Sequence, residues 1–317
     1  MRKGKRLIAW IMAVVMLFTI CVFGGNGTAE AAATTPVAKH GRLSVKGADL
    51  VDSKGNKFQL RGISTHGINW DVGSPYVNKK AFKTLRDDWG VNAIRLAMYT
   101  EEYNGYCSGG SQAKLRKLVD KGVGYATDLG MYAIIDWHIL SDGNPNKNKS
   151  QAKKFFTTMA KKYKNNKNVI YEICNEPNGC SWKEIKSYAT DIIKTIRKYD
   201  KKAVIIVGTP TWSQLGTDGT SNEVADSPIK GYKNIMYSLH FYASEWAHNE
   251  YLPAKVAYAR KKKLPIIVSE FGLSPASGDG AINKASADKW MKLLNKYNIS
   301  YFCWSLSNKN ESASMLK

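Results

Sequence analysis

Two glutamates each stand near the end of an apolar segment of the chain. Glu176 closes the segment 169–176, and Glu270 lies near the end of the segment 265–272. Burying a carboxylate in such a segment is costly unless it has a partner or a chemical role. Two carboxyl groups that meet in one cleft can cleave a glycosidic bond, one as acid and the other as nucleophile or base. The competing interpretation is that each glutamate forms only a structural ion pair with an arginine or lysine.

Aromatic residues near the ends of other segments fit a sugar substrate. Trp70 follows the first apolar segment, Tyr99 ends the second, and Trp304 lies in the last one. Their flat apolar faces can stack on the C–H faces of pyranose rings. A single aromatic residue at such a place more often packs into a core, but three at one rim favour sugar binding.

Three histidines could suggest a metal site. His66, His138 and His240 fall in three separate segments. Hydrolase zinc sites often take two of their ligands from one short motif, which is absent here. We therefore interpret the histidines as hydrogen-bonding groups and expect neither a metal nor an organic cofactor.

Eight short segments rich in β-branched and aromatic residues recur along the chain, and their starts are 30 to 39 residues apart. Most are apolar on both faces, as buried parallel strands are, and helix-like stretches lie between them. This alternation predicts an α/β fold, a (β/α)8 TIM barrel, with a doubly wound open sheet as the alternative. Chemistry in such a barrel takes place where the strands end. The predicted strands are 58–64, 93–99, 132–138, 169–176, 203–209, 235–242, 265–272 and 299–307.

The segments on either side of the barrel lead to two further expectations. Residues 43–51 and 57–60 flank the turn-like segment 52–56, so we expect an N-terminal β-hairpin that plugs one end of the barrel. Only ten residues follow the eighth predicted strand. The last helix of the barrel is therefore expected to be missing, which would make the seam between the first and eighth strands the least stable part of the fold.

The N-terminus has the pattern of a secretory signal peptide. Basic residues precede the apolar stretch 7–23, and Ala29-Glu30-Ala31 is a small-residue cleavage site. We expect residues 1–31 to be the signal peptide, 32–42 an N-terminal extension and 43–317 the catalytic domain. The protein would then be secreted and extracellular, with no membrane partner once the signal is removed. The alternative is a membrane anchor, although about 17 apolar residues is the lower limit for a span.

Charge and cysteine content add little to the assignment of function. The 317 residues include 47 Lys and Arg against 26 Asp and Glu, a formal net charge of +21. Because the lysines are spread over many segments, a solvated surface explains them better than a nucleic-acid site. Export permits disulfides, but free thiols are common in strand-like segments, so the pairing stays open for Cys107, Cys174, Cys180 and Cys303.

The motifs at the predicted strand ends resemble those of glycoside hydrolase family 5, the cellulase family A clan of retaining (β/α)8 enzymes, and within it the bacterial secreted endo-β-1,4-glucanases. The resemblance runs from about residue 43 to residue 316. Its motifs are Ile94-Arg95 with Met98-Tyr99-Thr100, Ile135-Asp136-Trp137-His138, Tyr171-Glu172 with Asn175-Glu176-Pro177, His240-Phe241-Tyr242, Ser269-Glu270-Phe271-Gly272 and Trp304-Ser305-Leu306.

The resemblance implies roles for the central residues of these motifs. Glu176 would be the acid/base and Glu270 the nucleophile. Arg95 and Tyr242 would orient Glu270 and hold it ionised. Retention would place the carboxyl groups of the two glutamates about 5–5.5 Å apart.

The resemblance also implies which residues hold the substrate. Asn175 would bind the 2-hydroxyl of the sugar at the cleavage point, and His138 and His240 would line the same site. Glucose subsites on the non-reducing side would be formed by His66, Trp70, Tyr99, Trp304, Lys309 and Glu311.

These implications make the chain a monomeric endo-β-1,4-glucanase that hydrolyses internal bonds of cellulose and related β-glucans with retention. Its partner would be the β-1,4-glucan polysaccharide, and no nucleic acid. One alternative is the same chemistry on another β-glycan, such as mannan, lichenan or xyloglucan. The other is a non-catalytic carbohydrate-binding wall protein, against which the intact pair of glutamates argues.

Overall fold

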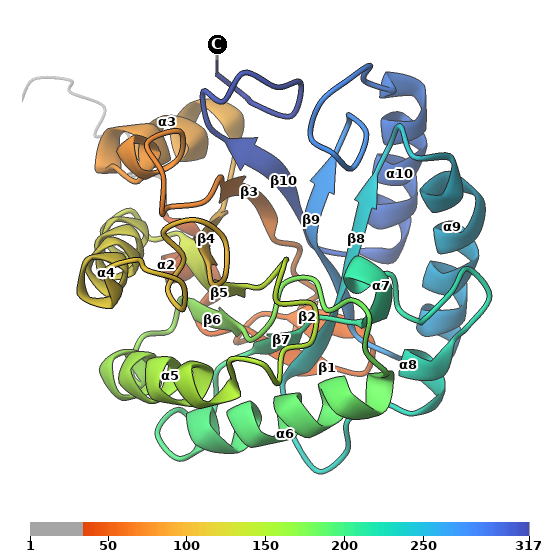
Figure 1. The fold of residues 1–317 in the computed structure, drawn as a ribbon, viewed down its shortest axis with the longest axis horizontal. Coiled ribbons are helices and arrows are strands. Elements are labelled where there is room, and N and C mark those ends of the chain that lie inside the picture. Colours follow the sequence, from red (N-terminus) through yellow and green to blue (C-terminus); the bar gives the residue numbers. More distant parts are fainter. Residues whose placement is uncertain (1–33, 317) are drawn as a thin grey trace, which may run out of the picture. The chain divides into compact units, whose positions relative to one another are not determined.

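Eight parallel strands form a closed barrel, which confirms the predicted fold and excludes the open sheet (Figure 1). The computed structural model describes residues 34–316, and within them the strands neighbour one another in the order β10-β3-β4-β5-β6-β7-β8-β9. The second, third and sixth strands have the predicted bounds. The strands are β3 (Arg61–Thr65), β4 (Ala93–Tyr99), β5 (Tyr132–His138), β6 (Val169–Glu172), β7 (Ile205–Val207), β8 (Ile235–Tyr242), β9 (Ile266–Gly272) and β10 (Tyr301–Leu306).

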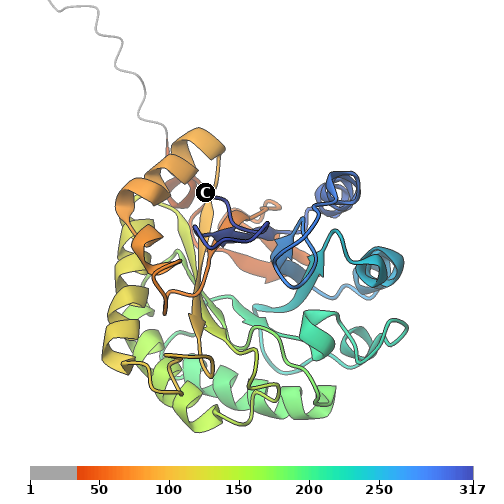
Figure 2. The same ribbon diagram turned by 45° about the horizontal axis from the view of Figure 1, so that its top comes forward.

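Helices connect the strands and lie around the outside of the barrel (Figure 2). In the helix that begins at Trp182, Ser181 and Glu184 form a capping box, while Ile185 and Tyr188 are buried on one face. The longer helices are α3 (Lys79–Trp89), α4 (Gln112–Asp128), α5 (Lys149–Tyr163), α6 (Trp182–Arg197), α9 (Trp246–Lys261) and α10 (Lys284–Tyr297). The short ones are α2 (Pro36–His40), η1 (Ser74–Tyr76), α7 (Pro210–Ser213) and α8 (Glu223–Asp226).

A β-hairpin closes the N-terminal end of the barrel, as predicted. β1 (Ser44–Lys46) pairs antiparallel with β2 (Asp49–Val51). Leu50, Phe58 and Leu60 are buried in one cluster with inward-facing residues of the barrel strands. The apolar plug therefore fills the end of the barrel that lies away from the site.

The turn of this hairpin does not lie where we expected it. Residues 43–51 are not one strand, because the chain reverses at Gly47 and Ala48, and Gly47 has a φ of 62°, which favours glycine. The segment 52–56 forms a second turn instead, in which the Asp52 carboxylate accepts hydrogen bonds from two backbone N–H groups. Residues 47–48 and residues 52–56 both contain residue types that favour turns. We predicted the hairpin turn at 52–56 because that segment is the longer one.

The outer face of β10 is less covered than the outer faces of most other strands. Tyr301 and Cys303 are half-buried, whereas every residue of β4, β5, β8 and β9 is buried. Within residues 34–316 no helix follows β10. The chain folds back so that Met315 bonds to the Ser305 carbonyl and packs, with Leu316, against the core. The lower stability of this seam stays a prediction.

Three further expectations concern the cysteines, a membrane span and the N-terminus. The four cysteines at 107, 174, 180 and 303 carry free thiols in the structure. No helix in the described part of the chain is both long and apolar enough to cross a membrane. The predicted signal peptide, residues 1–31, lies outside the described residues, as do the first two residues of the predicted extension 32–42.

Replacing Leu50 with alanine tests the contribution of the plug. Leu50 is 2% exposed, so its loss should leave a cavity and lower the free energy of unfolding by about 2–5 kcal/mol. Val45→Ala is the control, because Val45 belongs to the same hairpin but is only partly buried and should cost clearly less. Urea unfolding measures both variants, and equal losses would show that the plug does not fill the barrel end as described.

Candidate active site

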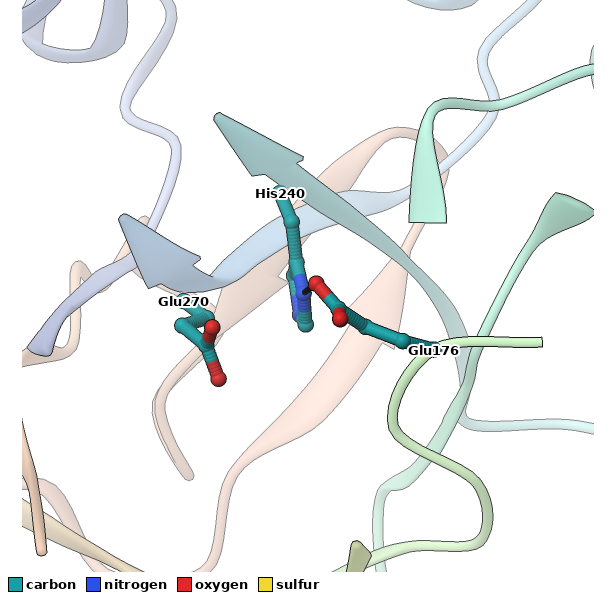
Figure 3. A group of neighbouring side chains, drawn as sticks. All are labelled: Glu176, His240 and Glu270. Carbon is teal, nitrogen blue, oxygen red and sulfur yellow. Dashed lines mark hydrogen bonds and ion pairs between the residues drawn. The ribbon is translucent and has the colours of Figure 1, made fainter. Parts of the chain in front are cut away.

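Glu176 and Glu270 face each other at the C-terminal end of the barrel, with His240 beside them (Figure 3). Glu176 follows β6, and Glu270 lies in β9. Each carboxyl group has an oxygen within 4.8 Å of an oxygen of the other. Retaining glycosidases hold their carboxyl groups about 5–5.5 Å apart, and inverting ones about 6.5–9.5 Å apart. The separation therefore favours retention.

The fully buried guanidinium of Arg95 joins the acidic groups beneath the site. It donates to Oε2 of Glu270 at 2.9 Å and to Oε2 of Glu172 at 2.7 Å, and it lies 3.1 Å from Oδ2 of Asp136. The contact with Glu270 agrees with the prediction. Glu172 and Asp136 stood in the quoted motifs but were not among the predicted site residues, because a motif does not reveal that three acids share one cation.

Three carboxyl groups around one guanidinium leave an excess of negative charge in a buried place. Burial raises the pKa of Asp136 to about 7, although Arg95 acts in the opposite direction. Burial also raises the pKa of Glu172, and repulsion from Asp136 adds to that effect. Asp136 and Glu172 therefore keep their protons up to a higher pH than exposed carboxyl groups do.

Glu270 is held by a donor on each of its oxygens. Oε2 accepts from Arg95, and Oε1 accepts from the hydroxyl of Tyr242 at 2.8 Å. Burial and the charge of Glu270 raise the pKa of Tyr242 well above its ordinary value, so its hydroxyl remains a donor. The two bonds fix the orientation of the carboxyl group toward the cleft.

Glu176 has a different environment. Its Oε1 lies 2.8 Å from Nδ1 of His240, and Nε2 of His240 lies 2.9 Å from the Ser269 hydroxyl. Burial raises the pKa of Glu176 to about 8, and the charges of the two buried acids near Arg95 add to the effect. Burial lowers the pKa of His240 to about 4. At neutral pH Glu176 therefore carries a proton beside a neutral imidazole.

Asn175 and His138 form a buried network next to the two glutamates. The Asn175 amide donates toward Nε2 of His138 at 3.2 Å and to the Ile139 carbonyl at 3.1 Å, and its oxygen accepts from Arg95. Nδ1 of His138 lies 2.6 Å from Oδ2 of Asp136, and burial lowers the pKa of His138 to about 3. Both amide hydrogens of Asn175 have protein acceptors, so the predicted bond to a sugar 2-hydroxyl requires one of them to be shared.

The predicted aromatic residues form a wall beside the glutamates. The rings contact one another in a closed circuit. Centroids of neighbouring rings are 4.1 to 5.7 Å apart in the order Trp70, Tyr99, His138, Trp304, His66 and again Trp70. Tyr99, His66 and Trp304 line a cavity of about 480 Å³ around the two glutamates. Trp70 packs behind this wall, half-buried, and is not part of the lining.

Lys309 and Glu311 lie at the same end of the cavity and form an ion pair. Nζ of Lys309 is 2.5 Å from Oε2 of Glu311, and Oε1 of Glu311 is 3.8 Å from Nε2 of His66. Burial lowers the pKa of His66 to about 4, and the positive charge of Lys309 adds to the effect. The structure thus brings both predicted residues to the cavity, where they can hydrogen-bond to sugar hydroxyls.

Sequence reasoning missed other residues that line the cavity, among them Trp212 and Gln214 after β7, Glu245 after β8 and Ser277 after β9. Trp212 is 44% exposed and, like Thr211, Ser213 and Leu215, has a positive φ angle, 52° at Trp212 itself. Its N–H donates to the Pro177 carbonyl, next to Glu176. A signal was available, because Trp212 lies three residues after the predicted strand 203–209, closer to its strand end than Trp70 is to the end of 58–64.

A buried lysine holds the loop that carries Gln214. Lys255 of α9 is 4% exposed, and its ammonium donates to the carbonyls of Gln214, at 3.1 Å, and Asp218. A side chain at Gly216 would meet this ammonium and the Ser221 carbonyl, so only glycine fits there. Burial lowers the pKa of Lys255. The ammonium of Lys255 thus holds this loop in place through two hydrogen bonds.

The two glutamates and His240 could also hold a metal ion. Glu176, His240 and Glu270 each offer a ligand atom, and these atoms lie within 4.8 Å of one another. The three predicted histidines do not form this group, since only His240 belongs to it. The close approach of the carboxyl groups is equally what glycosidic cleavage requires.

Fold and site together define the class of protein. A closed (β/α)8 barrel with two carboxyl groups meeting at the strand ends is the architecture of a two-carboxylate glycoside hydrolase. Residues 51–310 match cellulase, glycosyl hydrolase family 5, and the chain belongs to this family.

Individual relatives support this membership. Endoglucanase A of Butyrivibrio fibrisolvens is 47% identical over 281 residues, covering 87% of this chain and 63% of that protein. The endoglucanase of Clostridium saccharobutylicum is 48% identical over 318 residues, covering 99% of this chain and 67% of that protein. This chain therefore spans about two thirds of their length. The catalytic domain of Thermobifida fusca endoglucanase Cel5A in complex with cellotetraose matches with a TM-score of 0.79 and 38% identity, covering 88% of this chain and 90% of that one.

The pKa of Glu176 makes a prediction about stability. Because its pKa is about 8 in the folded protein and about 4.5 in the unfolded chain, the wild type should lose free energy of unfolding as pH rises from 4.5 to 8. Glu176→Gln is neutral throughout and should escape this loss, so its melting temperature should rise relative to wild type across that window. Glu250→Gln, an exposed change, is the control. A constant difference in melting temperature between Glu176→Gln and wild type would contradict the raised pKa.

Proposed function

We propose that this chain hydrolyses internal β-1,4-glucosidic bonds of cellulose and related β-glucans with retention, as a secreted endoglucanase. The observation that carries the proposal is the pair of facing carboxyl groups in unlike environments. Glu270 accepts hydrogen bonds from Arg95 and Tyr242, whereas burial keeps Glu176 protonated at neutral pH. Membership in the family, the names of the relatives and the cellotetraose held by the Thermobifida fusca domain support the substrate class.

In the first step, Glu270 attacks the anomeric carbon and forms a covalent glycosyl-enzyme. The bond to the leaving sugar breaks as Glu176 donates its proton to the glycosidic oxygen. Glu270 loses its negative charge as the new bond forms, so its hydrogen bonds from Tyr242 and Arg95 weaken in this step. The pKa of about 8 keeps Glu176 in the acid form that this step needs.

In the second step, water attacks the anomeric carbon and displaces Glu270. Glu176, now a carboxylate, accepts the proton of that water and so returns to its acid form. His240 bonds to Glu176 at 2.8 Å and keeps the carboxyl group in place through both steps. Two displacements on one carbon restore its configuration, so the product retains the β-anomer.

The buried network and the aromatic wall position the sugar. Asn175 would offer one amide hydrogen to the 2-hydroxyl next to the reacting carbon, with His138 keeping the amide oriented. Substrate-binding roles on the non-reducing side fall to His66, Tyr99, Trp304, Lys309 and Glu311, which line the cavity, whereas Trp70 would support this wall from behind. These residues come from the segments around β3, β4 and β10, across the barrel from β7, whose loop carries Trp212 and Gln214.

The cellular setting forms part of the proposal. A signal peptide at residues 1–31 would export the protein, and a polymer too large to enter a cell would be met outside it. We propose a monomer with the polysaccharide as its partner and with no role for nucleic acid or an organic cofactor. The domain limits 32–42 and 43–317 are proposed on the same sequence grounds.

Hydrolysis of a panel of polysaccharides tests the function. Carboxymethylcellulose should lose viscosity well before much reducing sugar appears, and the first product observed by proton NMR should be the β-anomer. Cleavage of mannan or xylan in place of cellulose derivatives would assign the chemistry to another β-glycan. The absence of cleavage throughout the panel would leave a carbohydrate-binding protein.

Two variants separate the roles of the glutamates. Glu270→Ala should abolish turnover of every substrate, because the covalent bond cannot form. Glu176→Ala should slow cellulose hydrolysis about 10²–10⁴-fold, but it should spare the first step on dinitrophenyl cellobioside, whose leaving group needs no proton. Burst kinetics measure that step, and Glu250→Ala serves as an exposed control. Equal losses of the first step in both glutamate variants would contradict the assignment.

Removal of metal ions tests whether Glu176, His240 and Glu270 bind a metal ion. If Glu176, His240 and Glu270 act only as acid, support and nucleophile, prolonged dialysis against EDTA should leave activity on carboxymethylcellulose unchanged. Elemental analysis of the dialysed protein provides the control. A loss of activity that one divalent ion restores would assign a metal to this group and remove the nucleophilic role of Glu270.

A further inference from the structure

Two aromatic side chains of α9 are exposed next to each other. Trp246 is 68% exposed and Tyr251 is 38% exposed. Their ring centroids are 5.8 Å apart and the ring planes are nearly perpendicular, at 82°. Single exposed aromatic residues are ordinary on a protein surface, but adjoining ones form a patch that marks a binding site more often. We call Trp246 and Tyr251 the α9 patch.

The α9 patch lies at the end of the barrel that carries the site. Trp246 begins α9, and only three residues separate it from Tyr242, the last residue of β8, whose hydroxyl bonds to Glu270. Four residue steps span no more than about 14 Å. Figure 1 shows α9 starting beside the tip of β8. The patch is therefore within a few sugar units of the nucleophile.

The chain connects the patch to the cavity on two sides. Glu245, directly before Trp246, lines the cavity, and its carboxylate accepts from the N–H of Ala276, another lining residue. On the other side, the ring of Tyr251 lies against Gly219, where a side chain would approach it to 2.9 Å. Gly219 belongs to the loop that begins at Gln214 in the cavity lining. Surface that starts in the cavity thus continues to the patch.

The direction of this surface identifies the part of the substrate that would reach it. The acid Glu176 must lie beside the leaving sugar, because it protonates the oxygen of the bond that breaks. Trp212 bonds to the backbone next to Glu176, and Trp212 and Gln214 lie in the loop after β7. The residues assigned to the non-reducing side come from the segments around β3, β4 and β10. β8 neighbours β7, and the Tyr251 ring packs against Gly219 in the loop after β7 that carries Trp212 and Gln214, so the α9 patch adjoins the leaving-group side.

We propose that Trp246 and Tyr251 form a distal binding site for the reducing-end side of the polysaccharide, beyond the sugars held in the cavity. This inference rests on the proposed function. The site would take a neutral β-glucan, because aromatic faces match the apolar faces of pyranose rings and the neighbouring acidic residues, Glu245 and Glu250, disfavour an anionic chain. Long chains would gain this contact, and short ones would not.

Two substrates of different length test the site. Hydroxyethylcellulose is a neutral polymer that can reach the patch, whereas p-nitrophenyl cellobioside has only one ring beyond the bond that breaks. Trp246→Ala and the double variant with Tyr251→Ala should raise KM for the polymer about three- to tenfold, with kcat unchanged. Both constants for the short substrate should stay at the wild-type value, and Trp246→Phe should restore part of the polymer affinity.

Trp89→Ala is the matched control. Trp89 is 58% exposed, but it ends α3, before the start of β4, and so lies at the other end of the barrel. It should leave KM for both substrates unchanged. An equal change for both substrates in Trp246→Ala, or an unchanged KM for the polymer, would overturn the proposal. A shift in sedimentation coefficient with unchanged polymer kinetics would assign the patch to a second copy of the chain. A wild type that cleaves neither substrate would instead refute the proposed function.

Discussion

The guanidinium of Arg95 is the constraint on which the rest of the site depends. Strand β4 places it inside the barrel, where it bonds to Glu270 of β9 and Glu172 of β6 and lies against Asp136 of β5. A buried cation of this kind persists only if carboxylates surround it, and buried carboxylates persist only beside a cation. Loss of the guanidinium would leave three acids without compensation, so the charges of this layer are stable only as a group.

The two glutamates differ in their surroundings, because only Glu270 accepts a hydrogen bond from Arg95. Glu270 accepts a hydrogen bond from the cation, whereas the pKa of Glu176 is raised chiefly by burial; the charge of Arg95 opposes this shift, and repulsion from Asp136 and Glu172 adds to it. Direct contact with Arg95 thus orients Glu270, and burial favours the protonated form of Glu176. His240 cannot supply a compensating charge, because burial lowers its pKa to about 4. Two identical side chains less than 5 Å apart thereby acquire opposite roles in acid–base chemistry.

Much of this arrangement could be predicted from the sequence, for identifiable reasons. Strands β4, β5 and β8 had the expected bounds because all their residues are buried, so the apolar pattern and the strand coincide. Strand β6 ends four residues earlier than expected, because the apolar pattern continues after the ladder has ended. Glu176 and Glu270 stood out in the sequence as lone acids. The contact of Asp136 and Glu172 with Arg95 arises only when the strands fold into a barrel, so the sequence pattern does not reveal it. The place of Trp212 after a predicted strand indicated a strand-end residue, but its orientation depends on left-handed backbone angles that the residue types there do not predict.

The two sides of the cavity, which we propose bind the non-reducing sugars and the leaving group, are built by different physical means. On the non-reducing side, rings pack against one another and against the strand ends, so that Trp304 is 7% exposed and has little freedom to move. On the leaving-group side, the loop after β7 is held by left-handed residues and by the buried ammonium of Lys255, which bonds to carbonyls alone. Hydrogen bonds to a loop open more readily than a packed core. The first side is therefore suited to select one sugar, and the second to accept chains of varied length and then release them.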